Sequence, residues 1–189
     1  SSSAASDVYK RQFHILSDMI SRKILFVVFS LFASYQFADA NDFNYIDSLK
    51  KAEQKAPNDS IRYEALSKLA IAYSDSAYSK SIQCWKDALS IAKRNRNREQ
   101  MAHVYHQIGY ILLRKGEFPE ALLELKNALA IHEYNDDIKG AAQVYNDIGL
   151  IYKNWGRYEQ ALESHLTSLK HFEAIKDSEG ASMTANNIG

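Results

Sequence analysis

The sequence has little cysteine, little proline and no excess of charge of either sign. A single cysteine among 189 residues excludes a disulfide-stapled scaffold, because such folds need several cysteine pairs. Two prolines favour helices over a turn-rich all-β fold. Lys and Arg number 23 against 23 Asp and Glu, so the positive excess that nucleic-acid binding requires is missing. With 46% hydrophobic residues and a mean hydropathy of -0.38, the composition indicates a globular chain.

Residues 1–18 have no apolar periodicity and begin with a run of serine and alanine. The stretch 6–12 resembles a translated adaptor from sequencing libraries. We therefore interpret residues 1–18 as a non-native, disordered leader, with a disordered native tail as the alternative.

Residues 19–40 have the three parts of a secretory signal peptide. Met19 opens the stretch, Arg22 and Lys23 supply positive charge, residues 24–32 are an apolar run, and residues 38–40 read Ala-Asp-Ala. The alternative is a membrane anchor, but a spanning helix needs about 20 apolar residues. We therefore expect cleavage after residue 40 and export to the periplasm or another extracytoplasmic space.

Self-similarity with a period of 40 dominates the rest of the chain. Ile-Gly pairs recur at 108–109, 148–149 and 188–189, and 13 of 40 positions are identical between 101–140 and 141–180. Each copy contains two amphipathic segments with apolar residues three and four apart, which predicts a pair of helices. The sequence therefore predicts an all-α repeat array.

Turn and cap residues mark the ends of these predicted helices. Gly116 supplies an open backbone that ends the first helix of its pair. Pro119 suits the first turn of the second helix, where its missing N–H costs nothing. Asp137 and Asp177 are candidate N-caps for the helices that follow them.

Two glycines, Gly109 and Gly149, fall inside predicted helices. Glycine weakens a helix interior by about 1 kcal/mol, so we expect a compensating close approach of the paired helix. Ala121 or Ala161 is expected to face the glycine.

These features resemble the tetratricopeptide repeat (TPR) in a 40-residue form, which implies a solenoid of antiparallel helix pairs. His165 and Ser168 depart from the family pattern, because they are polar where it is apolar or alanine. The positions that match the pattern of large and small residues are predicted to be repeat-structural: Tyr105, Gly109, Gly116, Ala121, Tyr145, Gly149, Gly156 and Ala161.

The resemblance divides the chain into segments. A lone helix over 41–57, with Phe43, Ile46, Leu49 and Ala52 on one face, is predicted to cap the array. Repeats follow at 58–100 (degenerate), 101–140 and 141–180, and residues 181–189 begin a fourth. We interpret the array as truncated at its C-terminal end, because a solenoid repeat buries its face against the next one.

No motif indicates catalysis: the sequence has no phosphate-cradling glycine-rich loop and no G-x-S-x-G, H-E-x-x-H or C-x-x-C. His103 and His106 are either a metal pair without a third ligand or a polar surface. The basic run 93–98 is either an anion patch or helix-terminal charge. Cys84 is either a buried small hydrophobe or an intermolecular bridge. We therefore expect no catalysis, cofactor, metal or nucleic acid in this segment.

The resemblance implies a concave groove, lined by the first helix of each pair, that binds a protein or peptide. Tyr110, Leu113 and Leu150 are its candidate apolar anchors, and Arg114, Lys153 and Asn154 are candidates to hold a carboxylate. The predicted partner-binding residues are Glu64, Ser67, Ile71, His103, His106, Tyr110, Leu113, Arg114, Gln143, Asn146, Leu150, Lys153 and Asn154.

Two functions remain in view. The first is an exported, non-enzymatic module that binds a protein or peptide. The second follows from a resemblance to bacterial sensor proteins: the chain is the sensing region of a longer membrane-bound histidine kinase or DNA-binding regulator. The residues that follow 189 would distinguish the two, and the oligomeric state stays open.

Overall fold

The computed structural model describes residues 44–75 and 77–188. The predicted leader (1–18) and signal peptide (19–40) lie outside the described residues. The chain divides into two units, 1–48 and 49–189, which are described separately. Within the described ranges the structure is helix and turn without strands, and none of these helices has the length and apolar character needed to cross a bilayer.

Residues 44–54 are helical. In the first unit, the Ser48 hydroxyl donates to the Tyr45 carbonyl at 2.7 Å. In the second unit, Leu49 is buried and Ala52 is exposed. Glu53 pairs with Arg62 of the next helix at 2.6 Å.

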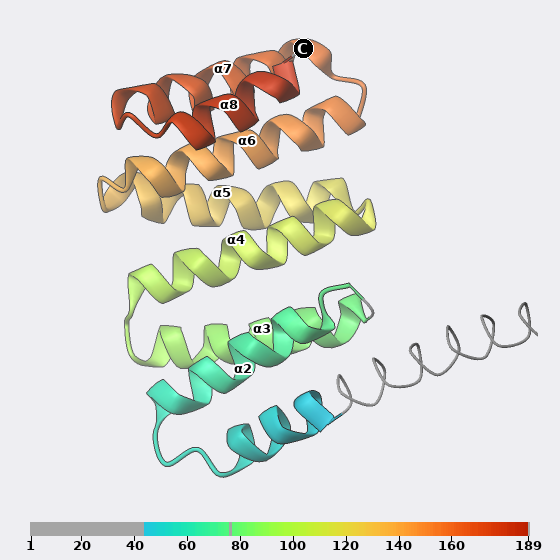
Figure 1. The fold of residues 1–189 in the computed structure, drawn as a ribbon, viewed down its shortest axis with the longest axis vertical. Coiled ribbons are helices and arrows are strands. Elements are labelled where there is room, and N and C mark those ends of the chain that lie inside the picture. Colours follow the sequence, from blue (N-terminus) through green and yellow to red (C-terminus); the bar gives the residue numbers. More distant parts are fainter. Residues whose placement is uncertain (1–43, 76, 189) are drawn as a thin grey trace, which may run out of the picture. The chain divides into compact units, whose positions relative to one another are not determined.

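The second unit continues as helices that stack in chain order (Figure 1). Pairs form between α2 and α3, α4 and α5, and α6 and α7, and each second helix also contacts the first helix of the next pair. The first helices α4, α6 and α8 contact one another in turn. The predicted all-α array of antiparallel helix pairs is confirmed. The bounds are α2 (Asp59–Tyr73), α3 (Tyr78–Arg94), α4 (Arg98–Lys115), α5 (Phe118–Tyr134), α6 (Ile138–Asn154), α7 (Tyr158–Ala174) and α8 (Ser178–Ile188).

The turns inside the later pairs use glycine. Gly116 and Gly156 have φ angles of 83° and 74°, the left-handed region that glycine enters without a steric penalty. Gly116 caps α4, and Pro119 lies in the first turn of α5. Both local predictions are confirmed.

The turns between pairs use a different device. Arg96, Asp136 and Lys176, which recur at the period of the repeat, have φ angles of 54°, 54° and 59°, although each carries a Cβ atom that this region disfavours. The residue after each of them is an N-cap. Asp137 and Asp177 accept from the backbone N–H groups of the glycines three residues on, at 2.9 and 3.0 Å, which confirms both predicted caps.

The helical glycines permit close packing, as predicted; Ala121 faces Gly109 together with Leu125, whereas His165 and not Ala161 provides the nearest atoms at Gly149. A Cβ atom on Gly109 would lie 2.7 Å from the Leu125 side chain and 3.2 Å from the Ala121 carbonyl oxygen. A Cβ atom on Gly149 would lie 2.5 Å from the His165 ring. The residue one turn after the expected alanine therefore fills the space above each glycine.

The polar residues of the third repeat are buried in its core. His165 and Ser168 are 1% and 0% exposed. The Ser168 hydroxyl donates to the Ala142 carbonyl at 2.7 Å and lies 3.2 Å from the Thr184 hydroxyl. Hydrogen bonds thus satisfy a position where the family pattern has alanine, and they join α6, α7 and α8.

Candidate functional site

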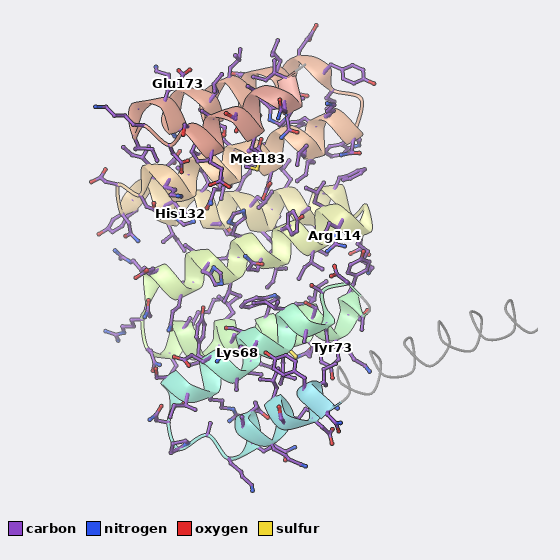
Figure 2. All side chains as sticks on the ribbon, in the orientation of Figure 1. Lys68, Tyr73, Arg114, His132, Glu173 and Met183 are labelled. Carbon is purple, nitrogen blue, oxygen red and sulfur yellow. The ribbon has the colours of Figure 1, made fainter. Side chains whose placement is uncertain are left out.

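Residues of α4, α6 and α8 line an open groove of about 470 Å³. We call it the α4–α6–α8 groove. Met183 is its contribution from α8 (Figure 2). The lining residues are His103, His106, Gln107, Tyr110, Gln143, Asn146, Asp147 and Met183.

The repeat period builds this lining. His103, Gln143 and Met183 occupy equivalent positions on α4, α6 and α8, and Gln107 is equivalent to Asp147. Equivalent residues of stacked helices point in similar directions, so the repeat forms the groove. Its chemistry comes from the positions at which the copies differ.

A histidine and an aspartate bridge two helices of the groove. Nε2 of His106 on α4 lies 2.8 Å from Oδ2 of Asp147 on α6, and the two side chains are 16% and 13% exposed. Within the described residues, the structure records no hydrogen bond to the second carboxylate oxygen, Oδ1. The pair therefore presents a carboxylate oxygen at the junction of the two helices.

A second polar group of the lining is buried. Asn146 is 4% exposed, and its Oδ1 accepts from Asn187 at 2.9 Å and from Nδ1 of His165 at 3.2 Å. Nε2 of His165 is buried without a partner in the described part of the chain. Burial, together with the positive charge of Lys153, lowers the pKa of His165. This network fixes Asn146 and joins the groove to α7 and α8.

Two side chains supply apolar surface to the groove. Tyr110 is 42% exposed and Met183 is 49% exposed. His103 packs edge-on against the Trp85 ring at 5.4 Å between ring centroids, and partial burial lowers the pKa of His103. Neutral histidine, tyrosine and methionine together suit a ligand with both apolar and hydrogen-bonding groups.

The groove contains five of the predicted partner-binding residues: His103, His106, Tyr110, Gln143 and Asn146. The prediction missed Gln107, Asp147 and Met183. Met183 could have been found from the repeat, since it lies one full period after Gln143. Gln107 and Asp147 each follow a predicted residue and line the groove beside it.

One predicted contact is wrong, because the structure buries its side chain. Leu113 is 9% exposed and belongs to the hydrophobic core, so it is not an available anchor. Asn146 lines the groove, but its oxygen is already engaged by its two neighbours. Leu150 is partly buried against the core.

The remaining predicted residues lie outside the lining. Arg114, near the C-terminal end of α4 (Figure 2), pairs with Asp75 at 2.6 Å. Lys153 donates to the Asn187 carbonyl at 3.1 Å, and Asn154 donates to the Leu150 carbonyl at 2.7 Å. The residues on α2 do not reach this groove: Ser67 is partly buried, whereas Glu64 and Ile71 are exposed.

The alternatives raised by the sequence gain no support as separate sites. No group of three His, Cys, Asp or Glu residues within 44–75 and 77–188 is arranged to hold a metal. In the basic run, Arg94 pairs with Asp59 at 2.5 Å, while Lys93 and Arg98 lie over the rings of Tyr105 and Tyr134. Cys84 is partly buried against the core.

Comparison with known proteins identifies the repeat. Residues 142–170 match the model of the tetratricopeptide repeat, which covers most of α6 and α7. No curated protein sequence matches the chain significantly.

Several solved structures share the fold. BtubC from P. vanneervenii is 19% identical, with a TM-score of 0.64, over 79% of this chain and 62% of BtubC. A Rap protein complexed with Competence and Sporulation Factor is 22% identical, with a TM-score of 0.67, over 82% of this chain and 44% of the Rap chain. Aspartyl phosphate phosphatase F from Bacillus subtilis is 19% identical, with a TM-score of 0.71, over 79% of this chain and 40% of that protein.

This chain spans less than two thirds of the length of each of these structures, and identities this low establish the fold alone. Together with the family match, they show that the chain carries a tetratricopeptide repeat at residues 142–170 within a TPR-like array of helix pairs.

Proposed function

We propose that this chain is an exported binding module that holds a peptide segment of a partner protein in the α4–α6–α8 groove. The observation that carries the proposal is the lining itself. It combines solvent-exposed Tyr110 and Met183 with the hydrogen-bonding side chains of Gln107, Gln143 and Asp147. The volume of about 470 Å³ falls in the range of ordinary ligand sites.

The energy of such binding would concentrate at Tyr110. Burying a large apolar side chain contributes about 1.5 to 3 kcal/mol, and interface energy is typically carried by a few aromatic anchors. The surrounding amides can exchange hydrogen bonds with a peptide backbone, which gives the segment a fixed direction. The Rap protein, which shares this fold and is complexed with Competence and Sporulation Factor, supports a role in binding another molecule.

Binding can be tested with peptides selected from a displayed random peptide library on the full chain. We expect Tyr110→Ala to lower the affinity for the selected peptides about 10-fold or more, measured by fluorescence anisotropy, with unchanged helicity in circular dichroism. Leu123→Ala is the matched control, because Leu123 is 61% exposed on α5 and lies outside the groove. Equal affinity for the unmodified chain and Tyr110→Ala would exclude this groove as the binding site.

Export rests on the signal-peptide pattern at 19–40 and has its own test. Expression of the chain in a bacterium, followed by N-terminal sequencing of the periplasmic product, should give Asn41 as the first residue. A product found in the cytoplasm with an intact N-terminus would contradict export.

The sensor region of a longer regulator is a second candidate, favoured by the order of a signal-peptide pattern followed by 40-residue repeats. In that case the same groove would bind the signal. A histidine kinase or DNA-binding segment in the complete reading frame would support this candidate, and a stop codon soon after a capping helix would exclude it.

A further inference from the structure

We propose that the α4–α6–α8 groove selects its peptide through a lysine or arginine side chain that binds the Asp147 carboxylate. This inference rests on the proposed function and assigns the chemistry of the partner. It gives a role to Asp147, which the sequence analysis did not single out.

The first argument is the state of the carboxylate. The Asp147 side chain is 13% exposed, and its Oδ2 lies 2.8 Å from the His106 ring. Oδ1 has no recorded partner, and it is not among the buried polar atoms that lack one, which belong to His132, His165 and His171. It is therefore open to the groove. A largely desolvated carboxylate gains most from a charge-assisted hydrogen bond with a cationic donor.

The second argument is the charge of the surroundings. Among the lining residues, Asp147 is the one acidic side chain, and no lysine or arginine is present. The nearby basic side chains of Arg114 and Lys153 are engaged with Asp75 and with the Asn187 carbonyl. Within the described residues, no lysine or arginine lines the groove, and the Asp147 carboxylate has the His106 ring as its neighbour. This carboxylate complements a basic ligand group.

The third argument is the shape of the neighbouring groups. Tyr110 lies one helical turn after His106 on α4 and presents an exposed ring, which can take a cation against its face. Met183, from α8, offers a flexible apolar surface for the methylene stem of a lysine or arginine. Gln107 and Gln143 remain for hydrogen bonds to the peptide backbone. The lining thus offers a contact for the charged group, the methylene stem and the backbone of a basic residue.

The repeat provides an internal control. The equivalents of Asp147 are Gln107 on α4 and Asn187 on α8, so an amide occupies this position in both neighbouring copies. Asp147→Asn therefore removes the charge and keeps a side chain that the fold accommodates elsewhere. Asp147→Glu keeps the charge, and Asp87→Asn removes one carboxylate from α3, outside the groove lining.

The test uses the library-selected peptides and a copy of each in which its basic residue is replaced by glutamine. On the unmodified chain, we expect selected peptides to be enriched in Lys or Arg, and the glutamine copy to bind about 10-fold more weakly. For the Asp147→Asn variant, the affinity for the basic peptide should fall by the same factor, while the affinity for the glutamine copy should not change. Asp87→Asn should change neither affinity, and Asp147→Glu should retain part of the preference. Thermal melts of each variant verify folding.

The outcomes separate this inference from the proposed function. If Tyr110→Ala lowers the affinity for both peptides but Asp147→Asn lowers it for neither, the groove binds peptides and the proposed selection by charge is wrong. If Tyr110→Ala lowers the affinity for neither peptide, the groove is not the binding site and the proposed function is wrong. Selected peptides without enrichment in basic residues, or equal losses for both peptides on Asp147→Asn, would also overturn the inference.

Discussion

Replacing Gly149 by alanine tests how tightly α7 packs on α6. The added Cβ atom would lie 2.5 Å from Cε1 of His165 and 2.7 Å from each ring nitrogen, well inside the roughly 3.5 to 4.0 Å at which carbon atoms normally pack. The ring is 1% exposed, so it has little space into which to move. Any movement also strains its 3.2 Å hydrogen bond with Asn146.

The expected magnitude follows from two opposing effects. Overpacking in a well-packed core costs about 1 to 3 kcal/mol, and the lost hydrogen bond adds about 1 kcal/mol. Alanine in place of glycine returns about 1 kcal/mol of helix propensity. We therefore expect Gly149→Ala to lower the free energy of unfolding by about 2 kcal/mol, measured by urea denaturation with circular dichroism.

The same change should reverse its sign when the ring is absent. In a His165→Ala background the clash disappears, and Gly149→Ala should stabilise the chain by up to about 1 kcal/mol. The double-mutant cycle would then give a coupling of about 3 kcal/mol between the two positions. If Gly149→Ala stabilised the unmodified chain, or if it had equal effects in both backgrounds, the packing argument would be refuted.

Two further predictions concern a turn and a titration. Lys176 has a φ of 59°, so Lys176→Gly should raise the free energy of unfolding by about 0.5 to 1 kcal/mol. As a control, Lys170→Gly within α7 should lower it by about 1 kcal/mol. If urea denaturation showed both variants changing the free energy of unfolding in the same direction, strain at Lys176 would be contradicted. Burial lowers the pKa of His165 in the folded chain, so the unfolded chain binds more protons as the pH falls through about 6.5. Stability should therefore decline from about pH 7.5 towards pH 5, and His165→Leu, which copies Leu125 of the preceding repeat, should reduce that decline; an unchanged pH profile would count against this role of His165.

Much of the fold could be predicted because its determinants are local. Gly116 and Pro119 act through their own backbone geometry, and Asp137 and Asp177 act on N–H groups three residues away. The left-handed conformations of Arg96 and Lys176 were missed, because nothing in these two side chains indicates a positive φ. The turn at Arg96 is closed by a backbone hydrogen bond from the Asn97 N–H to the Ala92 carbonyl at 2.9 Å.

The site was harder to predict because helical spacing fixes a face only approximately. Tyr110 and Leu113 lie three residues apart on α4, close enough in angle to be assigned to one face, yet Tyr110 is 42% exposed and Leu113 is 9% exposed. The boundary between groove and core passes between them, and packing of the neighbouring helices sets its position. Contact between α4 and α6 likewise joins His106 to Asp147, 41 residues away.

The sequence by itself determined the period of 40, the helix pairs and the caps, because each depends on residues a few positions apart or on repetition along the chain. The tertiary structure alone decided which polar residues are buried, which groups cover the helical glycines, and which carboxylate opens to the groove. Those properties depend on how stacked helices approach one another, and the side chains of adjacent repeats set that approach jointly.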